Sequence, residues 1–240
     1  MQVNDPTGKV EAALADERWP NWADKRWPSW PVVLREFETM QRLVDEGLSL
    51  ARYGDGELGC TDGQGYNGQE MRPGLKEEMR EILLRPHPRC LPAIPTMDER
   101  SPRFAYWLNY QDRFRKLIDQ RRVYGSAFIG CRAKAPWIDT DEYVNLMRSL
   151  WVGKRHVCVL PADIDMVPWM PDCLEFVHCP KLNAYDTIDK IEAQVVSLKP
   201  DVVTITAGPM ATCLANRLAG HGIQGVDLGR AIGLLTIHSP

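Results

Sequence analysis

Between residues 123 and 229 the sequence alternates short apolar runs with amphipathic segments, and this alternation limits the possible folds more than any other feature. The runs that we expect to form strands cover residues 123–131, 155–162, 174–180, 201–208 and 223–229. The segments with helical spacing of apolar residues are 139–153, 185–199 and 209–222. Strands and helices in alternation predict an α/β, Rossmann-like domain with a mostly parallel sheet flanked by helices.

The N-terminal half contains further elements but no dividing linker. We expect a helix at 32–47, a buried strand at 48–54, helices at 72–85 and 101–122, and a proline-rich loop at 86–95. Residues 32–240 are therefore predicted to form one domain. Residues 1–31 form a separate Trp/Pro-rich segment that contains the related strings "RWPNW" and "RWPSW". Its indoles suit either a strap that fills a groove or an aromatic platform for a sugar or base.

Composition excludes some classes of function. The formal net charge of -3 argues against a global basic field for nucleic acid. The seven cysteines are scattered and include no C-x-x-C pair, which predicts reduced thiols and a cytoplasmic protein. The first residues contain no apolar signal-peptide core, and no apolar run approaches the roughly 20 residues that span a bilayer. We therefore expect no transmembrane segment.

The string "ARYGDGEL" (residues 51–58) begins in the predicted strand at 48–54 and continues past its end. Ligands of parallel sheets bind at the carboxyl ends of strands. In extended backbone, residues i and i+2 face the same side, so Asp55 and Glu57 are expected to aim at one ligand such as Mg²⁺ or Mn²⁺. Arg52 could pair with a phosphate, while Gly54 and Gly56 would permit a bend and a close approach. The alternative is an acidic turn with solvated side chains.

Three further candidates also follow predicted strands. The helix that begins at Gly208, Pro209, Met210 and Ala211 could offer free N–H groups to a phosphate. Asp227 could be a base, a hydroxyl acceptor or a neighbour of a metal site. Asn183 could bond a base or sugar. Each has a plainer interpretation as an ordinary turn or helix cap.

Three motifs of the sequence are most informative when they are taken together. "SLARYGDGEL", "CPKLNAYDTIDKI" and "AGPMATCLANRLAGHGIQGVDLG" occur in this order. Together they resemble the GT-D-type glycosyltransferases, which carry Arg-aromatic-Gly-Asp-Gly-Glu, Pro-Ser-x-Asn-Ala, and a Gly-Pro-Thr-Ala helix start leading to Asp-x-Gly-His. The resemblance covers most of residues 48–229. The first motif matches closely, and the other two match in part.

The resemblance implies a Rossmann-like fold and transfer of a sugar from a nucleotide-diphosphate donor, UDP-glucose in the studied case. It implies a divalent cation, Mn²⁺ or Mg²⁺, held by Asp55 and Glu57, with the residues from Gly208 to Ala211 near the nucleotide. Asn183 and Asp227 would line the same pocket. If the transfer inverts the anomeric configuration, which the sequence leaves open, Asp227 is the expected base. The hydroxyl acceptor would be a glycan, a glycoprotein or a hydroxylated nucleobase in DNA, and a homo-oligomer is compatible with the sequence.

The chain also departs from the family pattern. Arg230 stands where the family has His, Met210 stands for Thr, and "GCRAKAPW" replaces a Thr-Arg-Pro segment in which Arg132 alone is clearly kept. We therefore expect a donor or acceptor different from that of the studied members. A metal-dependent phosphoesterase and a non-catalytic nucleotide-binding module are the alternative functions.

Overall fold

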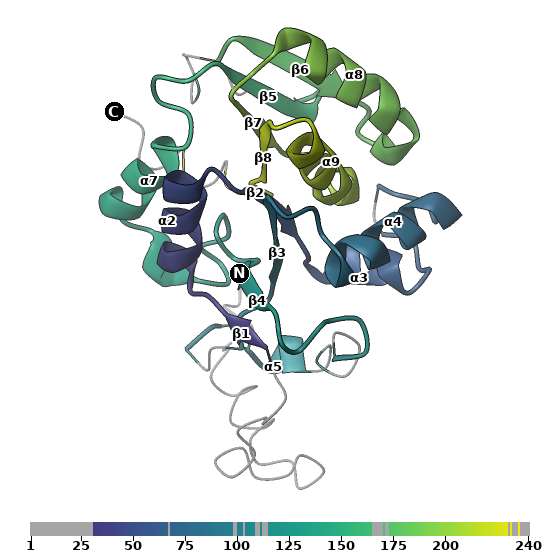
Figure 1. Ribbon diagram of the computed structural model, residues 1–240. Coiled ribbons are helices and arrows are strands. Elements are labelled where there is room, and N and C mark those ends of the chain that lie inside the picture. The colour runs from purple at the N-terminus through teal and green to yellow at the C-terminus, as the bar shows by residue number, and fades with distance from the viewer. Residues whose placement is uncertain are drawn as a thin grey trace, which may run out of the picture.

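The computed structural model describes residues 31–66, 68–97, 100–102, 104–108, 111, 115–164, 170, 173–229, 231 and 235. Within them the chain forms one parallel sheet in the order β1-β4-β3-β2-β8-β7-β5-β6 (Figure 1). The strands are β1 (Val32–Val33), β2 (Ser49–Arg52), β3 (Cys90–Ile94), β4 (Val123–Ser126), β5 (His156–Pro161), β6 (Glu175–Cys179), β7 (Val202–Ile205) and β8 (Gln224–Asp227). The expected α/β architecture is confirmed.

Helices cover both faces of the sheet. They are α2 (Glu36–Glu46), α3 (Asp55–Thr61), α4 (Pro73–Leu84), α5 (Phe104–Leu108), α7 (Asp141–Arg148), α8 (Ile188–Leu198) and α9 (Pro209–Gly220), with 3-10 helices η1 (Pro136–Ile138) and η2 (Ala184–Thr187). Helices α2 and α7 pack together, and α9 packs against α3, α4 and α8 (Figure 1). In the described ranges, every helix is too short or too polar to cross a bilayer.

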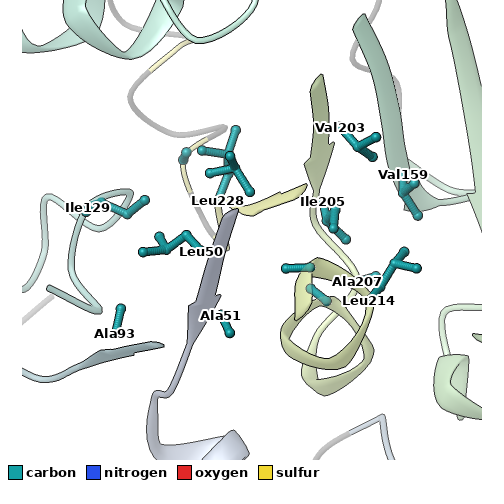
Figure 2. Packing of buried hydrophobic residues seen from close by; sticks show 14 of the residues in the cluster. Leu50, Ala51, Ala93, Ile129, Val159, Val203, Ile205, Ala207, Leu214 and Leu228 are labelled. Carbon is teal, nitrogen blue, oxygen red and sulfur yellow. The ribbon is translucent and has the colours of Figure 1, made fainter. Parts of the chain in front are cut away.

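The core lies on both faces of the central strands. Figure 2 shows Ala51 and Leu214 on the α9 side of the sheet, and Leu50 and Ile129 on the opposite side. Leu50 and Ala51 of β2, Ile205 of β7 and Leu214 of α9 are fully buried. The β-branched run of β7 is buried at every residue, which is typical of a parallel strand covered on both faces. This packing fixes β2, β8 and the start of α9 relative to one another.

Residues 86–95 were expected to be a proline-rich loop, and that expectation is wrong. Residues Cys90–Ile94 form β3, a fully buried strand between β2 and β4. A proline normally disfavours a central strand because it lacks an N–H for the ladder. Here β3 pairs with β4 only at Ala93 and Ile94, so Pro92 lies outside that ladder.

Of the helix expected at 101–122, the described residues include α5 (Phe104–Leu108) and two further helical residues, Gln111 and Arg115. The chain has left helical geometry by residues 116–122. The Trp/Pro-rich segment 1–31 lies outside the described residues except for its last residue. Its separation from the domain therefore stays a prediction.

Candidate functional site

The predicted site residues gather where the two halves of the sheet meet. Strand β2 begins the half that continues into β3 and β4, and β8 ends the half built from β5 to β8. The two strands pair through Leu50 and Val226, so their carboxyl ends are neighbours. Around these ends lie Arg52, Asp55, Glu57 and Asp227, which we call the edge cluster. Such a boundary is the usual ligand site of an open parallel sheet.

Arg52 and Asp227 form the buried centre of the edge cluster. Arg52 Nε lies 3.5 Å from Asp227 Oδ1, and the side chains are 15% and 2% exposed. Arg52 also donates from Nη1 to the Ala127 carbonyl over 3.0 Å, but its buried Nε makes no hydrogen bond. Gly229 has a φ of +55°, and a Cβ there would collide with the guanidinium. The backbone after β8 thus closes directly over Arg52 and requires glycine.

The Asp227 carboxyl is an unusual acid. Burial and the nearby Glu57 carboxylate raise its pKa to about 7, against the opposing effect of Arg52. Asp227 Oδ1 accepts from the Gly229 N–H over 3.0 Å, and the Thr212 hydroxyl of α9 lies 3.4 Å from Oδ2. A buried carboxyl with a pKa near neutrality can exchange a proton during a reaction.

Asp55 and Glu57 are not arranged as the sequence suggested. They occupy the first and third positions of helix α3 rather than extended backbone, so residues two apart do not share a face. Glu57 is 6% exposed, and its Oε2 accepts the Gly54 N–H over 2.8 Å. A Glu at the third helical position that bonds back to the cap is a known helix start signal, and it could have revealed α3.

Gly56 does not open the site as expected. A Cβ at this position would lie 2.7 Å from the Tyr66 ring, so the glycine makes room for that ring rather than for a ligand. Gly54 is buried at the cap of α3. The glycines of "RYGDGE" thus serve the tight packing of the α3 start.

Two residues absent from the sequence prediction act on Asp55. The Tyr106 hydroxyl of α5 donates to Asp55 Oδ2 over 3.0 Å. Burial tends to raise the pKa of Asp55, but the Lys134 ammonium and Tyr106 outweigh it and hold that pKa below its ordinary value. Asp55 therefore stays ionised at neutral pH. No local pattern marks Tyr106 or Lys134, because they reach Asp55 only through the placement of the segments after β3 and β4.

The start of α9 offers fewer N–H groups than expected. Pro209 has none, and the Ala211 N–H donates to the Gly208 carbonyl over 2.9 Å. Met210 and Ala211 bury their side chains in the core. Gly208 has a φ of +56° and open space where a Cβ would project. The N–H groups of Gly208 and Met210 are thus the ones that remain for an anion at this helix end.

The carboxylates of α3 suit a divalent cation only in part. Asp55 is half-buried and ionised, and its oxygens retain lone pairs beside the Tyr106 bond. Glu57 is buried and shares one oxygen with Gly54 N–H. No group of three His, Cys, Asp or Glu side chains suited to a metal occurs in the described ranges. A bound cation would take two carboxylates here and its other ligands from water and substrate, as Mg²⁺ commonly does.

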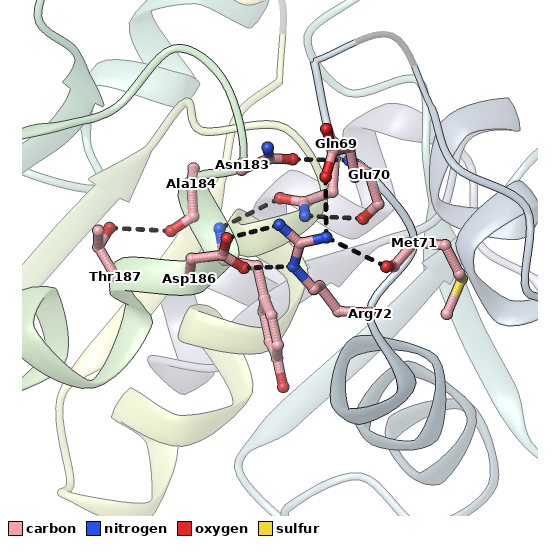
Figure 3. A network of polar contacts seen from close by, with 9 residues as sticks. Gln69, Glu70, Met71, Arg72, Asn183, Ala184, Asp186 and Thr187 are labelled. Carbon is pink, nitrogen blue, oxygen red and sulfur yellow. Dashed lines mark hydrogen bonds and ion pairs between the residues drawn. The ribbon is translucent and has the colours of Figure 1, made fainter.

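Asn183 makes hydrogen bonds within the protein that join two segments of the chain. With a φ of 54°, it accepts the Glu70 N–H at its side-chain oxygen over 2.7 Å and donates its own N–H to Gly68. Arg72 adds a bidentate ion pair with Asp186 (Figure 3). These contacts tie the loop after α3 to η2 and shape a shallow cleft of about 480 Å³ that Tyr66 and Asn183 line.

Arg132, the residue kept from the Thr-Arg-Pro segment, pairs with a residue outside the edge cluster. The described ion pair of Arg132 is with Asp139 at 3.2 Å, and its side chain is half exposed. Arg230 lies outside the described residues.

Comparison with known proteins gives this geometry a family. The model of the glycosyltransferase GT-D fold matches residues 50–233. A probable glycosyl transferase Gly of Streptococcus gordonii is 27% identical over 218 residues, covering 82% of this chain and 31% of that protein. Glycosyltransferase GlyD of Streptococcus pneumoniae serotype 4 is 24% identical, covering 80% of this chain and 26% of that protein. The chain spans less than a third of the length of these relatives.

Solved structures agree in fold. A glycosyltransferase (DUF1792) from Streptococcus sanguinis superposes with a TM-score of 0.70 at 22% identity, covering 84% of this chain and 82% of that one. A DUF1792 domain described as having a distinct glycosyltransferase fold superposes with a TM-score of 0.72 at 21% identity. The match covers 95% of this chain and 83% of that one. Because the family model spans most of the sequence, the chain belongs to the family of glycosyltransferases with the GT-D fold.

Proposed function

We propose that this chain transfers a sugar from a nucleotide-diphosphate donor, with a UDP-sugar such as UDP-glucose as the first candidate, to a hydroxyl group. The observation that carries the proposal is the edge cluster itself. It combines a buried carboxyl of raised pKa, an ionised carboxylate and a guanidinium beside the open start of α9. Family membership supports the class of reaction.

The proposed mechanism assigns each part of the cluster a task. Negative charge grows on the diphosphate as the glycosidic bond breaks, and donors fixed in advance stabilise it. Arg52 and the N–H groups of Gly208 and Met210 are the proposed donors. A divalent cation, Mn²⁺ or Mg²⁺, would be held by Asp55 and Glu57 and would neutralise part of that charge.

The acceptor needs a base, and we propose Asp227. Its pKa of about 7 lets the ionised form take a proton from the attacking hydroxyl at neutral pH. Arg52 and the Thr212 hydroxyl hold the carboxyl in place. The acceptor proposed is a glycan or glycoprotein; a hydroxylated nucleobase in DNA fits the acidic net charge of -3 less well. The seven unpaired thiols support action in the cytoplasm.

The alternative functions have less support. Metal-dependent phosphoesterases usually use several Asp and His ligands, whereas no three-residue cluster of that kind occurs in the described ranges. A non-catalytic module would bind the nucleotide without consuming the donor.

The test is UDP-glucose consumption with and without Mn²⁺, followed by mass spectrometry of the products. Asp55→Asn and Glu57→Gln should each lower turnover by about 100-fold, since removing one stabilising electrostatic contact commonly costs that much. Glu77→Gln, an exposed change on α4, is the matched control. Wild-type turnover in both variants would exclude the cation assignment, and binding of UDP without any donor consumption would favour the binding module.

A further inference from the structure

Lys134 lies in the segment after β4, and its effect on Asp55 is only one of the contacts of its side chain. Its ammonium lies over two aromatic rings, with Nζ 4.7 Å from the Trp107 centroid and 5.6 Å from that of Phe128. Both rings are buried. The backbone is fixed as well, because the Lys134 carbonyl accepts from Ser101 Oγ over 2.6 Å and its N–H donates to Cys131. The charge is thus held on a rigid apolar platform.

On these two rings, the ammonium of Lys134 lies near the edge cluster. Trp107 packs edge-on against Tyr106 at 5.2 Å, and Tyr106 bonds Asp55. The ammonium is close enough to Asp55, Glu57 and Arg52 for each to influence it electrostatically. Within the described part of the chain, however, Lys134 makes no ion pair. Among the described residues, its three N–H donors thus have no carboxylate within ion-pair distance, although Asp55 is near enough to act on the charge.

Arg52, which lies nearby, also has an N–H group without a hydrogen-bond partner in the described part of the chain. Its Nε is buried without a hydrogen-bond partner, and its contact with Asp227 is long at 3.5 Å. Lys134 and Arg52 thus both have N–H donors without a close acceptor, and both lie near the start of α3. An anion with several oxygens could accept hydrogen bonds from both side chains. Partial burial makes such a contact stronger than at an open surface.

We propose that Lys134 is a diphosphate-binding residue, which contacts the anionic group of the donor together with Arg52. The inference deepens the proposed function and rests on it for the identity of the donor. Part of the diphosphate affinity should then persist when divalent cations are removed, because Lys134 supplies positive charge from the protein itself. A lysine that served only to pack on Trp107 would not affect anion binding.

Calorimetric titration with inorganic pyrophosphate in EDTA tests the proposal on the whole chain. Lys134→Met keeps an apolar stem on Trp107 and removes the charge, while Lys134→Arg keeps the charge. We expect the methionine variant to bind pyrophosphate at least about 10-fold more weakly, as lost charge-assisted hydrogen bonds do, and the arginine variant to stay within about threefold of wild type. Lys190→Met, on the exposed surface of α8, is the matched control and should bind as wild type does.

Equal affinity in wild type and Lys134→Met, or no pyrophosphate binding by the wild type, would overturn the proposal. A second readout needs no variant: pyrophosphate should slow acetylation of Lys134 several-fold and leave Lys190 unaffected, and unchanged labelling of both would also overturn it. Pyrophosphate binding that depends on Lys134, without consumption of any UDP-sugar, would refute the proposed reaction while the anion site stands.

Discussion

Two buried carboxylates of this protein, Glu36 and Asp227, are almost equally hidden from water but differ in their partners. Glu36 accepts hydrogen bonds from Ser126 Oγ and Trp137 Nε1 at 2.7 Å each, and from Thr96 Oγ1 at 3.3 Å. Asp227 has one comparable bond, from Gly229, and longer contacts with Arg52 and Thr212. The first carboxylate is satisfied, whereas the second lies beside Glu57 with a raised pKa.

The difference in hydrogen bonding distinguishes a carboxylate with a structural role from one suited to a reaction. A buried polar group with good partners joins the elements that carry them, and Glu36 joins α2 to β4, the segment after β3, and η1. A buried acid with weak partners and a shifted pKa is costly to maintain and typical of a functional site. The protein thus uses one carboxylate to hold the sheet edge together, whereas the other, with a pKa of about 7, is the one proposed as the base.

The largest expected effect is on folding at Glu36. Glu36→Ala should lower the free energy of unfolding by about 3–5 kcal/mol, because it leaves several buried donors unpaired. Urea denaturation measures this loss, and the exposed Glu77→Ala is the control. A loss of unfolding free energy no larger than that of the control would show that Glu36 is not a structural carboxylate.

Asp227→Asn should act mainly on the reaction. If Asp227 is the base, donor turnover should fall by about 100-fold, which corresponds to about 2.7 kcal/mol. The rise of activity with pH near 7 should disappear as well. Asp189→Asn, 90% exposed on α8, is the control. Retention of the pH-dependent rise in Asp227→Asn would assign the base to another group.

The stability of the wild type should depend on pH through Asp227. Its folded pKa of about 7 lies above its unfolded value of about 3.9, so its contribution to stability is present below pH 4 and is lost as pH rises through 7. Between pH 5 and 8 the wild type should lose about 2 kcal/mol relative to Asp227→Asn, as measured by denaturation. Parallel curves for the two proteins would contradict the raised pKa.

The smallest effect is expected at Tyr106. Tyr106→Phe removes the hydroxyl that donates to Asp55, so the pKa of Asp55 should rise and kcat/KM should fall by about threefold to tenfold. Tyr185→Phe removes a similar Tyr–carboxylate bond, to Glu78, outside the edge cluster. Equal kinetics in these two variants would mean that the Tyr106 contact is structural.

The sequence predicts much of this fold because its strongest signals are local. Apolar, β-branched runs such as the one at β7 mark buried strands, and Gly47, with a φ of 62°, is the kind of residue that ends a helix such as α2. The strand β3 escaped prediction because Pro92 normally interrupts a central strand. Helix α3 escaped because it is short and contains two glycines, Gly56 and Gly59, which disfavour a helix.

The site was less predictable than the fold for a physical reason. Arg52 and Asp227 are the last residues of β2 and β8, and Asp55 follows β2, so the rule for parallel sheets locates them. Lys134 and Tyr106 reach Asp55 across 79 and 51 positions, and only the order of β4, β3 and β2 brings them there. No spacing in the sequence records that contact.

Amide hydrogen exchange with and without UDP tests most directly whether the edge cluster is the donor site. Bound nucleotide should protect the start of α9 at Gly208–Met210 and the start of α3 at Asp55–Leu58, while α8 stays unchanged. Protection confined to other segments, with neither helix start affected, would contradict the account.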